Sequence, residues 1–553
     1  MKRVTKILLL LASLSATLAY TQTTFQHIIV IVQENRTPDN LFQGLCASPY
    51  GTCPSPYNIS PNGTVILPPG TSGTQVALTP DPLYDDLDPD HGNKSFVQMY
   101  NSGGVNAGPT SVGCTKSPYC CPNNASECVI NGSWVFNWLH YVENDNFEYN
   151  GKFYNRLDPY LAVATQYGWA NYFFQTNQGP SFPAHQFLLS GTSTTSAPPN
   201  TLFAADNPYG AGNDFDNTGC TSPNGEVVKL IDGNGNENTN SPVYPCFEHA
   251  TLTDLLDNAG DSWRWYANTS GSIWTAPNAI HHICNPIAGN TCNGQDWVKN
   301  VAPYVGPLGP GMVLTDLGVN GTNHNACQLA DVSWVTPDGG WSDHGGIGGA
   351  GLGFGPSWVA DIVNAVGGVY YDTSGTKHNT PCPEYWGNTA VLIVWDDWGG
   401  WYDHVLPAPS PGVWLDNDQG ICPAPSNWGC GYIYGFRVPF MFVSAYTPQQ
   451  FVSGTVNLQN TTTCTDTQHC YDFGSILKFI ETNFNLAEIA GTNYHYADHV
   501  AKPLDPGFHS LPTARTFTPI PAPVPAICFV NPNTQNCYLN YTGPLDPDDD
   551  ASD

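Results

Sequence analysis

The chain has 553 residues, and its 46 Asp and Glu residues against 16 Lys and Arg residues give a formal net charge of −30. This surplus would repel a phosphate backbone, and no basic cluster follows the first few residues, so nucleic acid is excluded as a partner. The length exceeds that of one ordinary domain, but large α/β enzymes with long insertions reach it.

Residues 1–19 carry Lys and Arg near the start, then a Leu-rich apolar run, then small residues ending at Ala19. This pattern predicts a secretory signal peptide, because the apolar run is too short to span a bilayer. No later stretch is long and apolar enough for a membrane helix. We therefore expect a secreted or periplasmic protein without stable membrane insertion.

The eighteen cysteines agree with export. Close spacing predicts disulfide-closed loops at Cys46/Cys53, Cys422/Cys430, Cys464/Cys470 and Cys528/Cys537. A second group crowds together at Cys114, Cys120, Cys121 and Cys128. This group is compatible with zinc or with disulfides, and an exported protein favours disulfides.

In chain order, the first structural signal is an apolar run without alternation at residues 25–32, which predicts a strand buried on both faces. Glu34 and Asn35 follow it directly. In open α/β sheets, ligands bind outside the carboxyl ends of such strands. The alternative is that both residues only cap a following helix.

Two stretches, at about 46–141 and 193–245, are rich in turn-forming residues and are predicted to be insertions into a catalytic domain over residues 20–502. The first contains His91, which by itself indicates an exposed turn. From residue 503 to 553 a Pro-rich and finally acidic extension is expected to wrap the domain and end in disorder.

Between the insertions, residues 157–169 are predicted to be helical, and a second helix is predicted to begin near Pro183. Ser181 would then lie at the N-terminus of that helix, where free N–H groups favour an anion. The alternative is an ordinary N-cap serine. Further elements are predicted as helices at 250–259, 357–366 and 475–483 and as strands at 262–266 and 437–444.

The most informative stretch is a buried-strand pattern at residues 391–395, which ends in Asp396, Asp397, Gly399 and Gly400. Two adjacent carboxylates repel each other unless a cation or a shared proton offsets the repulsion. The glycines allow the chain to turn sharply. A polar turn alone would explain one such cluster, but a second acidic cluster after another strand favours a site.

This order of motifs resembles the phosphoesterase family that contains the non-haemolytic phospholipases C and the respiratory-burst-inhibiting acid phosphatases, within the alkaline phosphatase-like superfamily. The resemblance covers about residues 25–486. The blocks that carry it are residues 34–44 (ENRTPDNLFQG), 90–91 (DH), 179–183 (GPSFP), 342–344 (SDH) and 396–405 (DDWGGWYDHV). It implies an α/β fold with a mostly parallel sheet, helices on both faces and long disulfide-bonded insertions.

The resemblance also implies roles for single residues. Ser181 is the expected nucleophile, and His91 and His344 are expected to hold phosphoryl oxygens or to protonate the leaving group. One divalent cation is expected on the oxygens of Glu34, Asn35, Ser181, Asp396 and Asp397. An all-oxygen donor set favours Mg²⁺ or Ca²⁺.

Two blocks depart from the family pattern. The nucleophile block continues Pro183-Ala184-His185 where the family usually has Pro-Asn-Arg, so His185 is expected to substitute for the arginine in binding substrate. A later Asp-His-Thr-Ser block is replaced by DFGS at 472–475. Asp403 and His404 are expected to support the ligands from behind, and His404 is also a candidate for substrate binding.

The expected function is an exported, metal-dependent, acid phosphatase-like phosphoesterase that forms a phosphoserine intermediate. Its substrate would be a small phosphate ester, because the chain after residue 486 has no obvious room for the C-terminal β domains usual in the family's phospholipases C. The alternatives are a phospholipase C acting on phospholipid diesters, a sulfatase of the same superfamily, and an inactive surface protein with this fold.

Overall fold

The computed structural model describes residues 24–53, 56–65, 74–83, 88–96, 129–130, 133–134, 139–196, 202–210, 217–232, 237–288, 290–320, 326–345, 353–405, 407, 434–454, 464, 469–491 and 496–537. The predicted signal peptide, the Cys114–Cys128 group, the Cys422/Cys430 pair and the acidic end of the chain lie outside these residues.

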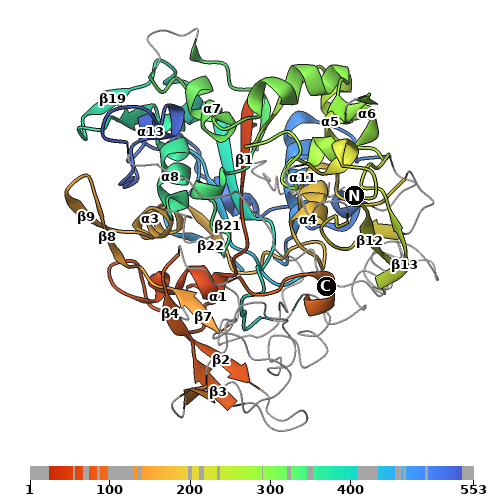
Figure 1. Cartoon of the computed structure of the whole chain (residues 1–553). Coiled ribbons are helices and arrows are strands. Elements are labelled where there is room, and N and C mark those ends of the chain that lie inside the picture. Colours follow the sequence, from red (N-terminus) through yellow and green to blue (C-terminus); the bar gives the residue numbers. More distant parts are fainter. Residues whose placement is uncertain are drawn as a thin grey trace, which may run out of the picture.

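A seven-stranded sheet forms the centre of the molecule (Figure 1). Its order is β14 (Trp263–Tyr266), β17 (Val332–Val335), β1 (His27–Gln33), β20 (Thr389–Trp395), β21 (Phe440–Val443), β10 (Gly168–Ala170) and β22 (Phe451–Ser453). Strand β21 runs antiparallel to both neighbours, whereas the other neighbouring pairs are parallel. The predicted α/β class with a mostly parallel sheet is confirmed.

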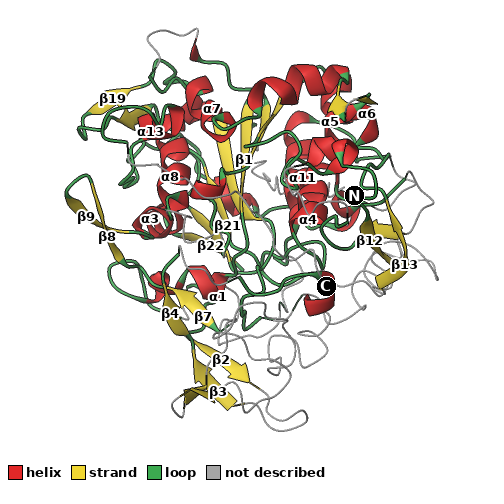
Figure 2. Cartoon of the chain, in the orientation of Figure 1, coloured by secondary structure: helices red, strands yellow, loops and turns green. Residues whose placement is uncertain are grey.

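Helices cover both faces of the sheet (Figure 2). In Figure 1, α3 (Asp158–Gln166), α7 (Gly309–Asp316) and α8 (Gly355–Val366) lie on one side of β1, and α4 (Ser181–Ser190), α5 (Leu252–Ala259) and α11 (Phe473–Phe484) lie on the other. This cover explains why β20 is apolar from Ala390 to Trp395 and fully buried. Apolar residues from the sheet and from both helix layers form one continuous core.

The pairing of β1 with β20 determines where the site forms. The two strands are parallel and pair from His27 opposite Thr389 to Gln33 opposite Trp395. Because they end level, the next residues, Glu34 and Asp396, leave the sheet at the same edge.

Most predicted elements are present with small shifts of their ends. Helix α3 stops at Gln166, before the predicted residue 169, because the chain enters β10 at Gly168. Helix α5 begins with a capping box between Thr251 and Asp254 and ends at Gly260, whose φ is 86°. Helix α11 begins with a capping box between Asp472 and Ser475, so the DFGS block starts a helix.

The remaining helices are short: α1 (Pro38–Leu41), α6 (His281–Cys284), α9 (Tyr385–Asn388), α12 (Ala497–Val500) and α13 (Ala526–Val530). Small ladders pair β2 (Asn62–Val65) with β3 (Thr74–Ala77), β4 (Thr79–Asp81) with β7 (His140–Val142), β5 (Val129–Ile130) with β6 (Ser133–Trp134), β8 (Asn146–Tyr149) with β9 (Lys152–Asn155), β15 (Pro286–Ile287) with β16 (Thr291–Cys292), and β18 (Val369–Tyr371) with β19 (Lys377–Asn379). Strands β11 (Leu202–Ala204), β12 (Val228–Asp232) and β13 (Glu237–Val243) form a separate sheet. The segment 46–141 therefore holds short ladders as well as loops.

Six disulfides join described residues: Cys46–Cys53, Cys220–Cys246, Cys284–Cys292, Cys327–Cys382, Cys464–Cys470 and Cys528–Cys537. Three of them were predicted from close spacing. The pair Cys327–Cys382 spans 55 positions, and such a partner is chosen by the fold and not by spacing. No helix in the described part of the chain is long and apolar enough to cross a membrane.

Two buried acids face each other beneath the helix that carries Ser181. Glu481 on α11 and Asp498 on α12 are both buried, and the backbone N–H of Ala497 donates to the carbonyl of Gly191 at the end of α4. Burial, the nearby charge of Asp498 and a hydrogen bond to it raise the pKa of Glu481 to about 9. The two carboxyl groups therefore share a proton at neutral pH. Lys478, Glu488 and His499 are the other charged groups around the pair.

We expect this pair to favour stability at acid pH. The pKa of Glu481 rises from 4.5 to about 9 on folding, so its contribution is complete below pH 4.5 and is lost as pH rises toward 9. The loss should be on the order of a few kcal/mol. Urea unfolding from pH 4.5 to 9 should therefore show a flatter stability profile for Glu481→Gln than for the wild type.

Glu488→Gln is the control, since it removes a neighbouring carboxylate and keeps the pair. Equal slopes for the wild type and Glu481→Gln would contradict a shared proton.

Candidate active site

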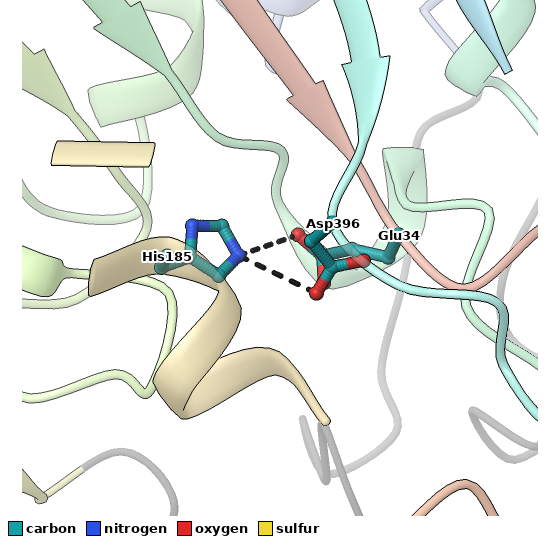
Figure 3. Close-up of side chains that lie close together, drawn as sticks. All are labelled: Glu34, His185 and Asp396. Carbon is teal, nitrogen blue, oxygen red and sulfur yellow. Dashed lines mark hydrogen bonds and ion pairs between the residues drawn. The ribbon is translucent and has the colours of Figure 1, made fainter. Parts of the chain in front are cut away.

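Three chain segments meet at the carboxyl edge of the sheet. Glu34 follows β1, Asp396 follows β20, and Ser181 and His185 lie on the first turns of α4. All four side chains are completely buried. Figure 3 shows Glu34 and Asp396 side by side at the ends of their strands, with the ring of His185 pointing at both.

The backbone after β1 is shaped to bring these groups together. Asn35 has a φ of 58°, a left-handed conformation that asparagine tolerates better than most residues. Its N–H donates to Asp396 Oδ1 at 3.0 Å. The N–H of Asp397 donates to the same oxygen at 2.7 Å. One carboxylate therefore fixes the loops after both strands.

Ser181 is the first residue of α4, so the predicted helix begins two residues before Pro183. Its hydroxyl donates toward Glu34 Oε2 at 3.2 Å and toward Asp397 Oδ2 at 3.4 Å. The side chain of Asn207, which the sequence did not reveal, accepts from the N–H of Phe182 at 2.9 Å and holds the helix start. The hydroxyl is thus directed at the acidic cluster, as a nucleophile with nearby bases requires.

His185 faces the carboxylates, and not an open substrate position. Its Nε2 lies 3.2 Å from Glu34 Oε1 and 3.6 Å from Asp396 Oδ2. Its ring also meets the indole of Trp265 edge-on, with centroids 6.4 Å apart. Its Nδ1 has no hydrogen-bond partner among the described residues. The structure therefore places a nitrogen donor inside a group that the sequence predicted to consist of oxygens.

The donor groups of this cluster fit a divalent cation. Ligand atoms of Glu34, His185 and Asp396 all lie within 4.8 Å of one another. The side-chain oxygen of Asn35 is buried and accepts no hydrogen bond from the described residues. An orphaned buried oxygen beside clustered carboxylates is the pattern that a bound cation would satisfy.

The carboxylate of Asp396 is held in its charged form. Burial by itself would raise the pKa of Asp396, but the hydrogen bonds from His185 and Glu34 and the charge of His185 outweigh it and lower the pKa. Asp396 is therefore available as a charged ligand even below neutral pH.

His91 and His344 lie together, with ring centroids 5.8 Å apart. His91 Nε2 is 3.0 Å from the side-chain nitrogen of Asn35, and His91 Nδ1 is 2.9 Å from the carbonyl of Pro89. His344 Nδ1 donates to the carbonyl of Gly345 at 2.5 Å. The fold thus brings His91 from a loop and His344 from the SDH block to the same edge of the sheet as Asn35.

Asp343, next to His344, was not predicted to have a role of its own. Its carboxylate accepts from Tyr160 at 2.8 Å and from the indole of Trp395 at 3.0 Å, and its carbonyl accepts from Arg36 at 2.7 Å. Burial raises the pKa of Asp343 to about 7, although the charge of Arg36 opposes the rise. These contacts hold the SDH block against the ends of β1 and β20.

His404 lies in a second buried group with Asp39, Asp403 and Arg437, and not beside Ser181. Asp39 Oδ2 accepts from His404 Nδ1 at 2.7 Å, and Arg437 makes two hydrogen bonds of 2.9 Å to Asp403. The other ring nitrogen of His404 is 3.1 Å from the side-chain oxygen of Asn58. Both nitrogens of His404 are therefore engaged within this group.

The two carboxylates of this second group have pKa values shifted in opposite directions. Burial would raise the pKa of Asp39, but the charge and hydrogen bond of His404 and the charge of Arg437 lower it. Burial raises the pKa of Asp403 to about 6 in spite of Arg437. Arg437, which sequence reasoning missed, also donates to the carbonyls of Asn58 and Asn171 at 3.0 and 2.7 Å. The group ties α1 to the chain after β20.

Gly399 and Gly400 allow the loop after β20 to touch the other site segments. Both have positive φ, 61° and 68°. A Cβ on Gly399 would lie 2.4 Å from the backbone oxygen of Asn35, and one on Gly400 would lie 2.6 Å from Pro89. Both positions therefore require glycine for conformation and for space.

The sequence of this chain is similar to a family of known proteins over the segments that form this site. The sequence profile of the Phosphoesterase family matches residues 25–487. Similar curated proteins include a non-hemolytic phospholipase C of Burkholderia pseudomallei, 26% identical over 43% of this chain and 32% of the relative. A hemolytic phospholipase C of Pseudomonas aeruginosa is 24% identical over 60% of this chain and 42% of the relative. Phospholipase C A of Mycobacterium tuberculosis is 27% identical over 36% of this chain and 35% of the relative. The chain thus matches less than half the length of these relatives.

We expect Gly399→Ala to disrupt the site while the sheet remains folded. The added methyl group would collide with the backbone of Asn35 and disfavour the φ of 61°, so Asn35 must move away from Asp396. Phosphoesterase activity should fall at least ~10²-fold, the scale of loss when reacting groups move by about 1 Å. Gly387→Ala is the control, because nothing lies within 4 Å of its Cβ position. Wild-type activity in Gly399→Ala would show that this contact does not set the site geometry.

Proposed function

Since this chain belongs to the Phosphoesterase family, we propose that it hydrolyses phosphoric esters at the cluster of Glu34, Ser181 and Asp396. The observation that carries the proposal is the buried Ser181 hydroxyl, directed at two carboxylates at the start of a helix. A serine in this setting has carboxylate bases within reach of its hydroxyl.

In the proposed reaction, Ser181 Oγ attacks phosphorus and its proton passes to Glu34 or Asp397, the carboxylates toward which it already donates. The bond from phosphorus to the leaving oxygen breaks, and a protonated His344 gives that oxygen a proton. Water then attacks the phosphoserine and gives a proton to the now neutral His344, the bond from phosphorus to Ser181 Oγ breaks, and Oγ takes back its proton from Glu34 or Asp397 as phosphate leaves. Each half of the reaction exchanges one P–O bond for another.

The groups that would hold a divalent cation are Glu34, Asn35, Ser181, Asp396 and Asp397. When bound, such a cation favours the serine alkoxide and neutralises charge on the phosphoryl oxygens. Five oxygen donors support Mg²⁺ or Ca²⁺, and His185 adds one nitrogen that manganese and zinc also accept. We propose one hard divalent cation at this position.

The primary substrate class that we propose is a small phosphate monoester, as in the acid phosphatases that the motifs resemble. A phospholipid diester is the second candidate, and the printed names of the similar proteins, all phospholipases C, favour it. We also propose that the protein acts after export, because the described cysteines are joined in disulfides. A sulfatase and an inactive protein are the remaining alternatives for the assay below.

The function is tested with a panel of a phosphomonoester, a phosphocholine diester and a sulfate ester, each with and without chelator across pH 4–8. We expect the monoester to turn over fastest, chelation to abolish turnover, and Mg²⁺ or Ca²⁺ to restore it. Asp396→Asn should lose bound cation and nearly all turnover, because it removes a charged ligand. Asp296→Asn is the control, because Asp296 lies outside all of these blocks and is only partly buried.

Full activity after thorough chelation would refute the metal requirement. Faster turnover of the diester would replace the phosphatase by a phospholipase C. Turnover of the sulfate ester alone, or of no ester, would favour a sulfatase or an inactive protein.

Ser181→Ala should remove the covalent route and leave the carboxylates in place. We expect this variant to bind phosphate or vanadate yet turn over at least ~10³-fold more slowly, the scale of loss for a nucleophile. Ser190→Ala changes the same residue type at the other end of α4 and should remain active, because that hydroxyl bonds only within its own turn and the next. Trapping of a phosphorylated residue other than Ser181 would place the nucleophile elsewhere.

A further inference from the structure

The amide of Asn35 has an orientation that can be read from its partner. An asparagine side chain presents either an oxygen or a nitrogen in almost the same space, so only hydrogen bonds distinguish the two orientations. Here Asn35 Nδ2 lies 3.0 Å from His91 Nε2. The other ring nitrogen, Nδ1, lies 2.9 Å from the carbonyl of Pro89.

These two contacts leave one consistent assignment of hydrogens. A backbone carbonyl only accepts, so His91 Nδ1 must carry a hydrogen. A second hydrogen, on Nε2, would point at the hydrogens of Asn35 Nδ2 3.0 Å away, so Nε2 is the acceptor. An amide oxygen cannot donate to it, whereas an amide nitrogen can. His91 therefore selects the orientation in which Asn35 Nδ2 faces the ring and Oδ1 faces away.

The oxygen of the same amide has no hydrogen-bond donor to offset its burial. Asn35 Oδ1 is buried and accepts no hydrogen bond from the described residues, which normally costs about 1–3 kcal/mol. The backbone N–H of the same residue donates to Asp396 at 3.0 Å, so Asn35 is tied to the segment that carries the acidic cluster. A buried carbonyl oxygen beside carboxylates that accepts no hydrogen bond is a candidate ligand for a cation.

We propose that His91 is a positioning residue for the cation: it fixes the Asn35 amide so that Oδ1, and not Nδ2, is presented as a ligand. This inference rests on the proposed metal-dependent function and refines it. It gives the two histidines different tasks, with His344 at the reacting phosphate and His91 behind the Asn35 ligand.

The surroundings of His91 suit this task, because its ring is held from several sides. His344 meets it edge-on at 5.8 Å, and Trp398 does so at 6.1 Å. The loop that carries His91 is fixed in turn by Gly400, which packs against Pro89 and Asp90. Asp88 Oδ1 lies 4.0 Å from His91 Nδ1, too far for a hydrogen bond.

The test is the affinity for Mg²⁺ and Ca²⁺, measured by titration calorimetry on the full chain, in His91→Phe, Asn35→Asp and the double variant. Phenylalanine keeps the aromatic contacts with Trp398 and removes the acceptor. We expect His91→Phe to weaken binding about 10–100-fold, the usual effect of losing a group that orients a ligand. In the Asn35→Asp background the same change should cost no affinity, because a carboxylate presents an oxygen in either orientation.

His344→Phe is the matched control, since it removes a neighbouring ring nitrogen without touching Asn35 and should leave the affinity unchanged. Thermal unfolding of each variant shows whether it is folded. Equal weakening by His91→Phe in both backgrounds would mean that His91 acts on the fold and would overturn the proposal. Unchanged affinity in His91→Phe would also overturn it and leave the proposed function standing. If the wild type binds neither ion, the metal-dependent function fails together with this inference.

Discussion

The parallel pairing of β1 with β20 is the constraint on which the rest of the structure depends. The strands are in register to their last pair, Gln33 and Trp395. The acidic residues that follow must therefore leave the sheet together, in a place without solvent. Carboxylates brought together in this way repel each other and are costly to bury. The site can exist only if other groups offset that cost, and the surrounding elements supply them.

Groups from several chain segments offset the cost of burying these carboxylates. Backbone N–H groups of Asn35 and Asp397 converge on one oxygen of Asp396, and Nε2 of His185 lies between Asp396 and Glu34. Ser181 adds its hydroxyl from the helix start. Behind this cluster, Arg437 holds Asp403 with two hydrogen bonds and also faces Asp39 at 3.5 Å. A buried ion group of this kind adds little to stability, because burying the charges costs free energy. It is favourable only when the charged groups are placed accurately. It fixes the segments that carry the proposed ligands. These polar contacts therefore position the site more than they stabilise the fold.

The sequence predicted the parts of this arrangement that are local. An unbroken apolar run followed by acids predicted β1 and β20, and a proline-flanked serine predicted the start of α4. The sequence did not predict β17, whose four residues include a serine and are too few for a periodic signal. Arg437 and Asn207 were missed because their partners lie far away in the chain, at Asp403 and at Phe182. His404 was expected to support the ligands from behind and was also a candidate for substrate binding. Its hydrogen-bond partner Asp39 is 365 positions away, and only the folded chain reveals that pair.

The replacement of the family's arginine by His185 shows how one side chain redistributes charge in such a site. An arginine carries a permanent charge on a long stem and a planar fork that matches phosphate. The shorter imidazole of His185 reaches Glu34 and Asp396, and its one facing nitrogen is used there. The side chain that the resemblance assigns to the substrate is therefore turned toward the carboxylates of Glu34 and Asp396. Under the proposed function, phosphoryl oxygens would then be bound by His344 and by the cation. The proposed chemistry would therefore depend more heavily on a cation than the same site with an arginine would.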